Sequence, residues 1–308
     1  MSANARLTVH THTAGEAGLF VNAYLVETAD GVVVIDTSLL NTDIAELAAR
    51  VAAVGKPLLG VFVTHAHPDH FNGAHALVAA HGAPVYATTA VAKTIRDIAD
   101  AKRAQWGPVY GDEWPAETAY PTVELADGDT VVLGGVTFTA REVGPAESHA
   151  DSYLLAQAGD GRPVAFIGDL AFHHVHSYTA DGHSTRWLEA LDTLTRELAD
   201  AAVLYPGHGA PGGVELFAAQ RQYLLFYREA VRGIAAGAPA LDDAGKERLD
   251  RAVRAYLPDA PLTWMIGLGA DAVAAELAAT AATAETEETV GTAGATAPAA
   301  PVGGPDTP

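Results

Sequence analysis

Four residues with metal-binding side chains lie within six positions of one another. The segment H-A-H-P-D-H supplies His65, His67, Asp69 and His70. In an extended chain the side chains alternate, so His65 and His67 point to the same side and can bind one metal ion. After the kink at Pro68 the next two side chains can face a second ion nearby. Because zinc and other first-row ions accept imidazole and carboxylate ligands, the segment predicts a metal site rather than a polar loop that is rich in histidine by chance.

Two cations held side by side are suited to hydrolysis. They lower the pKa of a bridging water from about 15.7 to about 7, which supplies hydroxide at neutral pH. One cation also polarises a carbonyl group and stabilises the developing oxyanion. We expect Asp69 to orient this nucleophile and to accept its proton. A Ser or Cys nucleophile is then not required, and the chain has no cysteine.

The elements around this segment predict a mixed α/β fold. The apolar run at residues 58–63 indicates a buried strand, so the ligands lie at a strand exit, where α/β sheets form their sites. Further strands are expected at 19–27, 32–36, 84–87, 130–133, 136–141, 153–157, 164–167 and 202–205, and helices at 42–54, 73–80 and 185–199. Three more ligand-type residues, His149, Asp169 and His208, lie in loops beside these strands.

The order of these motifs resembles the metallo-β-lactamase superfamily. The motifs are H-A-H-P-D-H, the loop histidine His149, G-D at 168–169 and P-G-H-G at 206–209, and the resemblance spans about residues 7–213. It implies an αββα sandwich with a dinuclear site along one edge. It also implies that one metal is held by His65, His67 and His149, that the other is held by Asp69, His70 and His208, and that Asp169 bridges them.

The resemblance implies a dinuclear hydrolase that cleaves an ester, thioester or lactone, with two Zn²⁺ as cofactors and manganese or iron as alternatives. Asp169 stands where the best-known zinc β-lactamases carry a cysteine, so the chain is more similar to glyoxalase II and to lactonases. Hydrolysis of β-lactams is an alternative, as is a mononuclear iron oxidoreductase similar to the persulfide dioxygenases. A non-enzymatic metal-binding protein is a third, disfavoured alternative, because the full ligand set is present.

Four side chains are candidates for contact with a small acyl substrate. The loop at residues 173–183 follows Asp169 closely, so we expect it to run along the rim of the site. The candidates are His174, His176, Tyr178 and Trp106. Trp106 belongs to residues 91–122, which we interpret as an inserted flap whose aromatic side chains line a cleft or pack the insertion onto the domain.

The amino-acid composition and the expected domains limit the kinds of molecule to which the protein can bind. An excess of 38 acidic over 18 basic residues gives a net charge of −20, which argues against nucleic acid as a partner. With no signal peptide, no run of about 18 apolar residues and no cysteine, we expect a cytoplasmic protein without a membrane span. We expect a catalytic domain at 1–213, a helical extension at 214–280 that could form a homodimer interface, and a disordered tail at 281–308.

Overall fold

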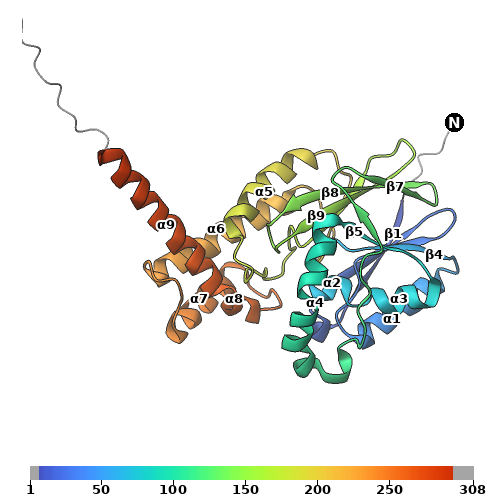
Figure 1. Ribbon diagram of the computed structural model, residues 1–308, viewed down its shortest axis with the longest axis horizontal. Coiled ribbons are helices and arrows are strands. Elements are labelled where there is room, and N and C mark those ends of the chain that lie inside the picture. The colour runs from blue at the N-terminus through green and yellow to red at the C-terminus, as the bar shows by residue number, and fades with distance from the viewer. Residues whose placement is uncertain (1–6, 294–308) are drawn as a thin grey trace, which may run out of the picture.

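The chain folds into two β-sheets that pack face to face, with helices on both outer sides (Figure 1). This computed structural model describes residues 7–293, with side chains as far as residue 282. The first sheet contains, in spatial order, β1 (Thr8–Thr13), β2 (Asn22–Glu27), β3 (Val32–Ile35), β4 (Leu58–Phe62), β5 (Val85–Thr88) and β6 (Val123–Leu125). The second contains β11 (Leu204–Pro206), β10 (Val164–Gly168), β9 (Asp151–Ala158), β8 (Val136–Gly144) and β7 (Thr130–Leu133). The expected αββα sandwich is confirmed.

Alternation along the strands builds the core between the sheets. In β3, Val33 and Ile35 face the second sheet, whereas the alternate side chains face the outer helices. Phe62 of β4 stacks on Tyr86 in its own sheet, with ring centroids 4.6 Å apart, and on Phe138 of the opposite sheet at 5.3 Å. These rings bury a continuous apolar layer between the sheets, as expected for sheets packed face to face.

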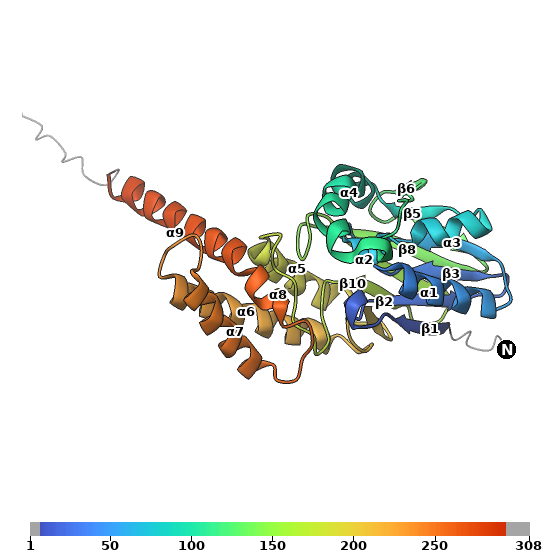
Figure 2. The same cartoon turned by 90° about the horizontal axis from the view of Figure 1, so that it is seen from below.

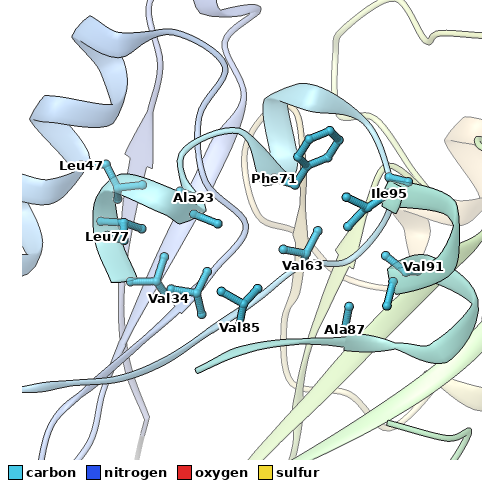
Figure 3. Packing of buried hydrophobic residues seen from close by; sticks show 14 of the residues in the cluster. Ala23, Val34, Leu47, Val63, Phe71, Leu77, Val85, Ala87, Val91 and Ile95 are labelled. Atoms are coloured by element: carbon cyan, nitrogen blue, oxygen red, sulfur yellow. The ribbon is translucent and has the colours of Figure 1, made fainter. Parts of the chain in front are cut away.

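Helices cover the outer face of each sheet. The first sheet is covered by α1 (Asn41–Ala53), α3 (Ala74–His81) and α4 (Thr89–Tyr110). Leu47, Leu77 and Val91 of these helices pack against Val34 and Val85 of the sheet, as Figure 3 shows. The second sheet is covered by α5 (Ser184–Glu197) and α6 (Glu215–Ala235). Both sheets are therefore buried on two faces, which explains the nearly continuous apolar runs of their central strands.

The C-terminal helices form a group at one end of the molecule, from which α9 extends away (Figure 2). They are α6, α7 (Asp243–Tyr256), α8 (Trp264–Leu268) and α9 (Ala270–Ala293). A small core of their own joins them, built around Tyr227, Leu249 and Ile266. The segment Trp264–Ala282, which runs from α8 into α9, is long and apolar enough to span a membrane by length and composition alone, and 33% of it is buried in the structure.

Two expectations about chain segments need correction. Residues 91–122, expected as an inserted flap, are helical over most of their length, because α4 continues to Tyr110 and is followed by the short 3-10 helix η2 (Gly111–Glu113). Arg103 of α4 anchors the next loop by donating hydrogen bonds to the carbonyl oxygen of Pro115 and to Thr118 Oγ1. The tail expected to be disordered from residue 281 is helical as far as Ala293. Residues 294–308 of that tail lie outside the described residues.

Candidate metal centre

The expected ligands lie at one edge of the sandwich, where strands of both sheets end. They are His65 and His67 after β4, Asp169 after β10 and His208 after β11. Asp69 and His70 lie on α2 (Pro68–Phe71), a single helical turn that begins at a proline. Proline is well suited to the first position of a helix, since its missing N–H would have no partner there.

Asp69, His70 and His208 form one group of converging ligand atoms, which lie within 4.8 Å of one another. Asp69 Oδ2 is 3.5 Å from His70 Nε2 and 3.3 Å from His208 Nε2. Asp169 approaches the same two imidazole nitrogens, with Oδ1 3.4 Å from His70 Nε2 and Oδ2 3.4 Å from His208 Nε2. Oxygen and nitrogen atoms at these separations can share one ion.

His65, His67 and Glu147 form a second group beside the first. His67 Nδ1 is 3.2 Å from Glu147 Oε2 and 3.2 Å from His65 Nε2, and Glu147 Oε2 is 3.7 Å from His65 Nε2. Asp169 connects the two groups, because it also converges with His65 and His70. The arrangement can therefore hold two ions side by side, with the Asp169 carboxylate between them.

His149, the ligand expected from the loop before β9, does not lie in either group. Its side chain is 53% exposed, its Nδ1 is 2.7 Å from His183 Nε2, and its Nε2 is 3.9 Å from Asp181. Glu147, two residues earlier and fully buried, takes the position that the sequence assigned to His149. The structure therefore places Glu147, and not His149, among the converging ligand atoms.

The turn between β8 and β9 explains which of the two residues points inward. Asp151 Oδ2 accepts hydrogen bonds from the backbone N–H groups of Ala146 and Ser148, at 3.1 and 2.9 Å. These bonds tighten the loop around Glu147. Asp151 also forms a β-bridge with His65, which fixes the loop against the first histidine of the metal-binding segment. The sequence shows Glu147 and Asp151 on either side of His149, but residue types alone do not reveal which side chain turns inward.

Further side chains hold the imidazoles in place. Asp36, which directly follows β3, accepts hydrogen bonds from His70 Nδ1 at 2.9 Å and from Thr64 Oγ1 at 2.7 Å. Thr64 Oγ1 in turn lies 3.1 Å from His65 Nδ1. Asp36 thereby leaves His70 Nε2 free to face the site, which is the usual role of a carboxylate behind a ligating histidine.

The remaining two imidazoles also have partners on their far sides. His208 Nδ1 lies 3.0 Å from the carbonyl oxygen of Leu19, and His67 Nε2 lies 3.2 Å from Asp181 Oδ2. Asp181 also accepts a hydrogen bond from the Tyr178 hydroxyl at 3.0 Å. Neither role was predicted, because Asp36 ends an expected strand far along the chain from the metal-binding segment, and Asp181 is one of several polar residues in the loop at 173–183.

Opposite charges perturb the titration of the buried group around Asp169. Burial lowers the pKa of His208, but the Asp169 and Asp69 carboxylates outweigh it and raise this pKa to about 9. Burial likewise raises the pKa of Asp169, yet His208 and His70 outweigh it and hold this pKa well below its ordinary value. Asp69 and Asp169 are therefore ionised at neutral pH, as ligands of a cation must be.

Several buried polar atoms at the site have no hydrogen-bond partner within the described chain. They are His70 Nε2, Asp169 Oδ1 and both carboxylate oxygens of Glu147. Burial raises the pKa of Glu147 to about 8, which shows how costly this carboxylate is without a counter-charge. All of these atoms point into the two ligand groups, so the residues present fit a pair of divalent cations.

A pocket of about 200 Å³ opens onto both groups and is lined by His67, Asp69, Glu147, Asp169 and His208. Of the four substrate candidates, Trp106 and Tyr178 line this pocket. His174 is exposed on a left-handed turn. His176 points away toward α6, with its Nδ1 3.2 Å from the Tyr223 hydroxyl. Neither histidine lines the pocket, because His176 is buried against Tyr223 and His174 is exposed, whereas Tyr178 and Ala180 of the same loop do line it.

Comparison with known proteins agrees with this geometry. The family model described as "Metallo-beta-lactamase superfamily" matches residues 17–208. Solved structures with the same fold include a metallo-beta-lactamase from Pontibacter korlensis, with 22% sequence identity and a TM-score of 0.56, over 73% of this chain and 97% of that one. A metallo-beta-lactamase from Hirschia baltica has 18% identity and a TM-score of 0.53, over 73% of this chain and 95% of that one.

The DIM-1 metallo-beta-lactamase, in a crystal structure exposed to ceftazidime, has 17% sequence identity and a TM-score of 0.54. The match covers 73% of this chain and 95% of that one. At these identities the likeness concerns the fold. The match of the family model covers more than half of the chain and reaches from the turn before β2 to His208. It includes the metal-binding segment, Glu147 and Asp169. The chain belongs to the metallo-β-lactamase superfamily.

Proposed function

We propose that this chain is a dinuclear metal-dependent hydrolase that cleaves an acyl bond of a small ester, thioester or lactone. The observation that carries the proposal is the convergence of His65, His67 and Glu147 beside Asp69, His70 and His208, with Asp169 between the two groups. Such a pair of sites at the floor of a pocket is an arrangement that hydrolases use to attack a carbonyl group.

The residues of the chain have distinct roles in this scheme. When bound, two divalent ions lower the pKa of water toward neutrality and polarise the acyl carbonyl. Asp69 is ionised and lines the pocket, so it orients the attacking water by accepting a hydrogen bond. Asp36 and the carbonyl oxygen of Leu19 keep His70 and His208 oriented toward the site. The aromatic walls of the pocket exclude bulk water from the reaction.

The carboxylate of Glu147 influences which metal ion the site prefers. With Glu147, Asp69 and Asp169 the ligand set carries three carboxylates, one more than the set that the sequence implied. Carboxylates favour harder ions such as manganese and iron relative to zinc. We therefore propose that Mn²⁺ or Fe²⁺ competes with Zn²⁺ at the site of His65, His67 and Glu147.

The test is a screen of the purified protein loaded separately with zinc, manganese and iron. The substrates are lactones, thioesters, aryl esters and a chromogenic cephalosporin, the last because the structural matches are metallo-β-lactamases. We expect metal-dependent hydrolysis of at least one acyl substrate, lowered by about 10³-fold or more in Asp69→Ala. His81→Ala, at an exposed histidine at the end of α3, is the control and should retain activity. Full activity after removal of metal would contradict the proposal.

One observation favours a second candidate function. Two histidines with one carboxylate, as in His65, His67 and Glu147, are also the ligand type of mononuclear non-haem Fe(II) oxygenases. On that alternative, the iron-loaded protein would consume oxygen with a thiol or persulfide substrate and would need no second ion. The complete second group of ligands favours the hydrolase. Oxygen consumption together with one iron per chain would favour the oxygenase.

A further inference from the structure

The walls of the pocket come from two segments outside the sheets. Helix α4 contributes Lys102, Gln105 and Trp106, and α8 contributes Trp264 and Leu268. The floor, by contrast, consists of the ligand groups that the sandwich supplies. Groups that can recognise the substrate are therefore separated from groups that act on its acyl bond. They lie on α4 and α8, which meet where Trp106 contacts Trp264.

The upper part of the pocket is aromatic. The ring centroids of Trp106 and Trp264 lie 6.5 Å apart, and Tyr110 stacks on Trp114 at 6.1 Å. Trp264 remains 46% exposed and its neighbour Leu268 41% exposed, although both are large and apolar. Apolar side chains left open at the mouth of a pocket indicate an apolar ligand. An aromatic ring can reach favourable offset or edge-to-face contacts with both tryptophans.

The same wall carries a cation without a partner. The chain has four lysines, and Lys56, Lys93 and Lys246 each form an ion pair with a carboxylate. Lys102 has neither an ion pair nor a hydrogen bond to any described residue, and it lines the pocket. Asp181 is near enough to interact electrostatically with Lys102, but the two form no ion pair. In a chain with a net charge of −20, an unpaired lysine at this position is available to an anionic group of a ligand.

We propose that the substrate is a small acyl compound that carries both an aromatic ring and a carboxylate, a proposal that rests on the hydrolase function above. The ring packs against Trp106 and Trp264 on their pocket side, and the carboxylate pairs with Lys102. The acyl carbonyl then reaches the ligand groups at the floor of the pocket. A cavity of about 200 Å³ matches a compound of this compact size rather than a long chain.

Binding is tested first, without turnover, on the metal-loaded full chain. The probes are the N-methyl monoamide of phenylsuccinic acid, which has a ring and one carboxylate, and the corresponding bis-amide, which lacks the carboxylate. Calorimetric titration compares the wild type with Lys102→Met, Lys102→Arg and Lys93→Met. Lys93 lies on the same helix and is paired with Asp97, so it is the matched control.

We expect Lys102→Met to weaken binding of the monoamide by about 10- to 100-fold and Lys102→Arg to weaken it less. The bis-amide should bind more weakly than the monoamide to the wild type and should not distinguish the variants. Lys93→Met should behave as the wild type with both probes, and Trp264→Ala should weaken both probes. Equal binding of the two probes to the wild type, or an unchanged affinity in Lys102→Met, would overturn the proposal.

A second measurement separates this inference from the hydrolase proposal. The 4-nitrophenyl ester of phenylsuccinic acid with its free carboxylate is compared with the same ester capped as an amide. We expect the free acid to have the higher kcat/KM and Lys102→Met to remove the preference through KM. Hydrolysis of both esters at equal kcat/KM would overturn the inference and leave the hydrolase intact. If the monoamide binds as predicted but no ester is hydrolysed, the hydrolase proposal is overturned, while the proposed binding of an aromatic carboxylate at Lys102 stands.

Discussion

Glu147 Oε2 lies 3.2 Å from Nδ1 of His67, in the position for which the sequence nominates His149. The contact is buried, and neither oxygen of Glu147 has a hydrogen-bond partner within the described residues. A carboxyl group buried in this way must be neutralised, either by a proton or by a bound cation. The relationship therefore changes both the composition of the metal centre and the expected charge of its ligands.

The first prediction concerns metal content. Glu147→Ala removes one of three ligands from its group, so we expect the bound metal to fall from two ions per chain toward one. His149→Ala should retain two ions per chain, because the His149 ring is exposed and contacts His183 instead. Metal per chain after gel filtration, measured by inductively coupled plasma mass spectrometry, distinguishes the two. Loss of an ion in His149→Ala, with retention in Glu147→Ala, would restore the original assignment.

The second prediction concerns which metal ion the site prefers, and it is tested by changing Glu147 to another ligand type. Glu147→His converts the group to three imidazoles, which should shift the competition between Zn²⁺ and Mn²⁺ toward zinc relative to the wild type. Equimolar zinc and manganese are offered to the metal-free protein, and the bound ratio is measured. An unchanged ratio would show that Glu147 does not influence the choice of ion.

The sequence was sufficient for the fold and for most of the site because the metal-binding segment is local. His65, His67, Asp69 and His70 are neighbours in the chain, and the apolar run before them places them at the end of β4. The choice between Glu147 and His149 depends instead on a turn. Its direction is set by hydrogen bonds to Asp151, which no pattern of residue types reveals.

The candidate substrate-binding residues likewise show that local sequence patterns do not predict contacts that depend on tertiary packing. Trp106 reaches the pocket because α4 is a continuous helix, whereas the chain around it suggested a loop. His176 is excluded because it packs against Tyr223 of α6, a contact across 47 positions in the chain. Lys102 and Trp264 come together at the pocket only through the packing of α4 and α8. Such long-range contacts are determined by the packing of whole elements and carry no local signal.

The partner of His70 should control metal affinity. Asp36→Asn keeps the shape of the side chain but removes the carboxylate that faces His70 Nδ1 at 2.9 Å. We expect the affinity of the Asp69, His70 and His208 group for metal to fall by about 10- to 100-fold. Asp43→Asn, at a buried carboxylate that binds the Gly15 N–H, is the control. Competition with a fluorescent chelator measures both, and equal affinities in the two variants would argue against the role of Asp36.

Glu276 should stabilise the junction between α9 and α5. Its carboxylate accepts hydrogen bonds from the N–H groups of Ser184 and Thr185, at 3.0 and 2.7 Å, and lies 3.4 Å from the buried Arg228. Glu276→Ala leaves Arg228 without this partner, so we expect a loss of about 2–4 kcal/mol in the free energy of unfolding. Urea denaturation measures it. Glu189→Ala, which breaks only an exposed pair, should change stability by less than about 0.5 kcal/mol, and a similar effect in both variants would contradict the role of Glu276.

His176 should make the fold sensitive to acid. Burial, with a smaller effect of Arg254 that Asp250 partly opposes, lowers the pKa of His176 from 6.5 to about 4. Between pH 6.5 and pH 4, His176 therefore binds a proton in the unfolded chain but not in the folded chain. The contribution of neutral His176 to stability is therefore complete above pH 6.5 and is lost as the pH falls toward 4.

The variant His176→Gln does not titrate, so its melting temperature should fall less steeply than that of the wild type between pH 6.5 and 4. Protonation of the metal ligands affects both proteins equally, so the difference between the two curves reports on His176. His174→Gln, at an exposed histidine of the same loop, should follow the wild type. Parallel curves for His176→Gln and the wild type would show that the position does not titrate in this range.

The metal centre itself is tested most directly by anomalous X-ray scattering from crystals of the metal-loaded protein. We predict two peaks per chain, one within about 2.0–2.2 Å of ligand atoms from His65, His67 and Glu147, and the other equally close to Asp69, His70 and His208. Asp169 should lie between the peaks. A single peak, or a peak bound by His149 while Glu147 points away, would contradict the account.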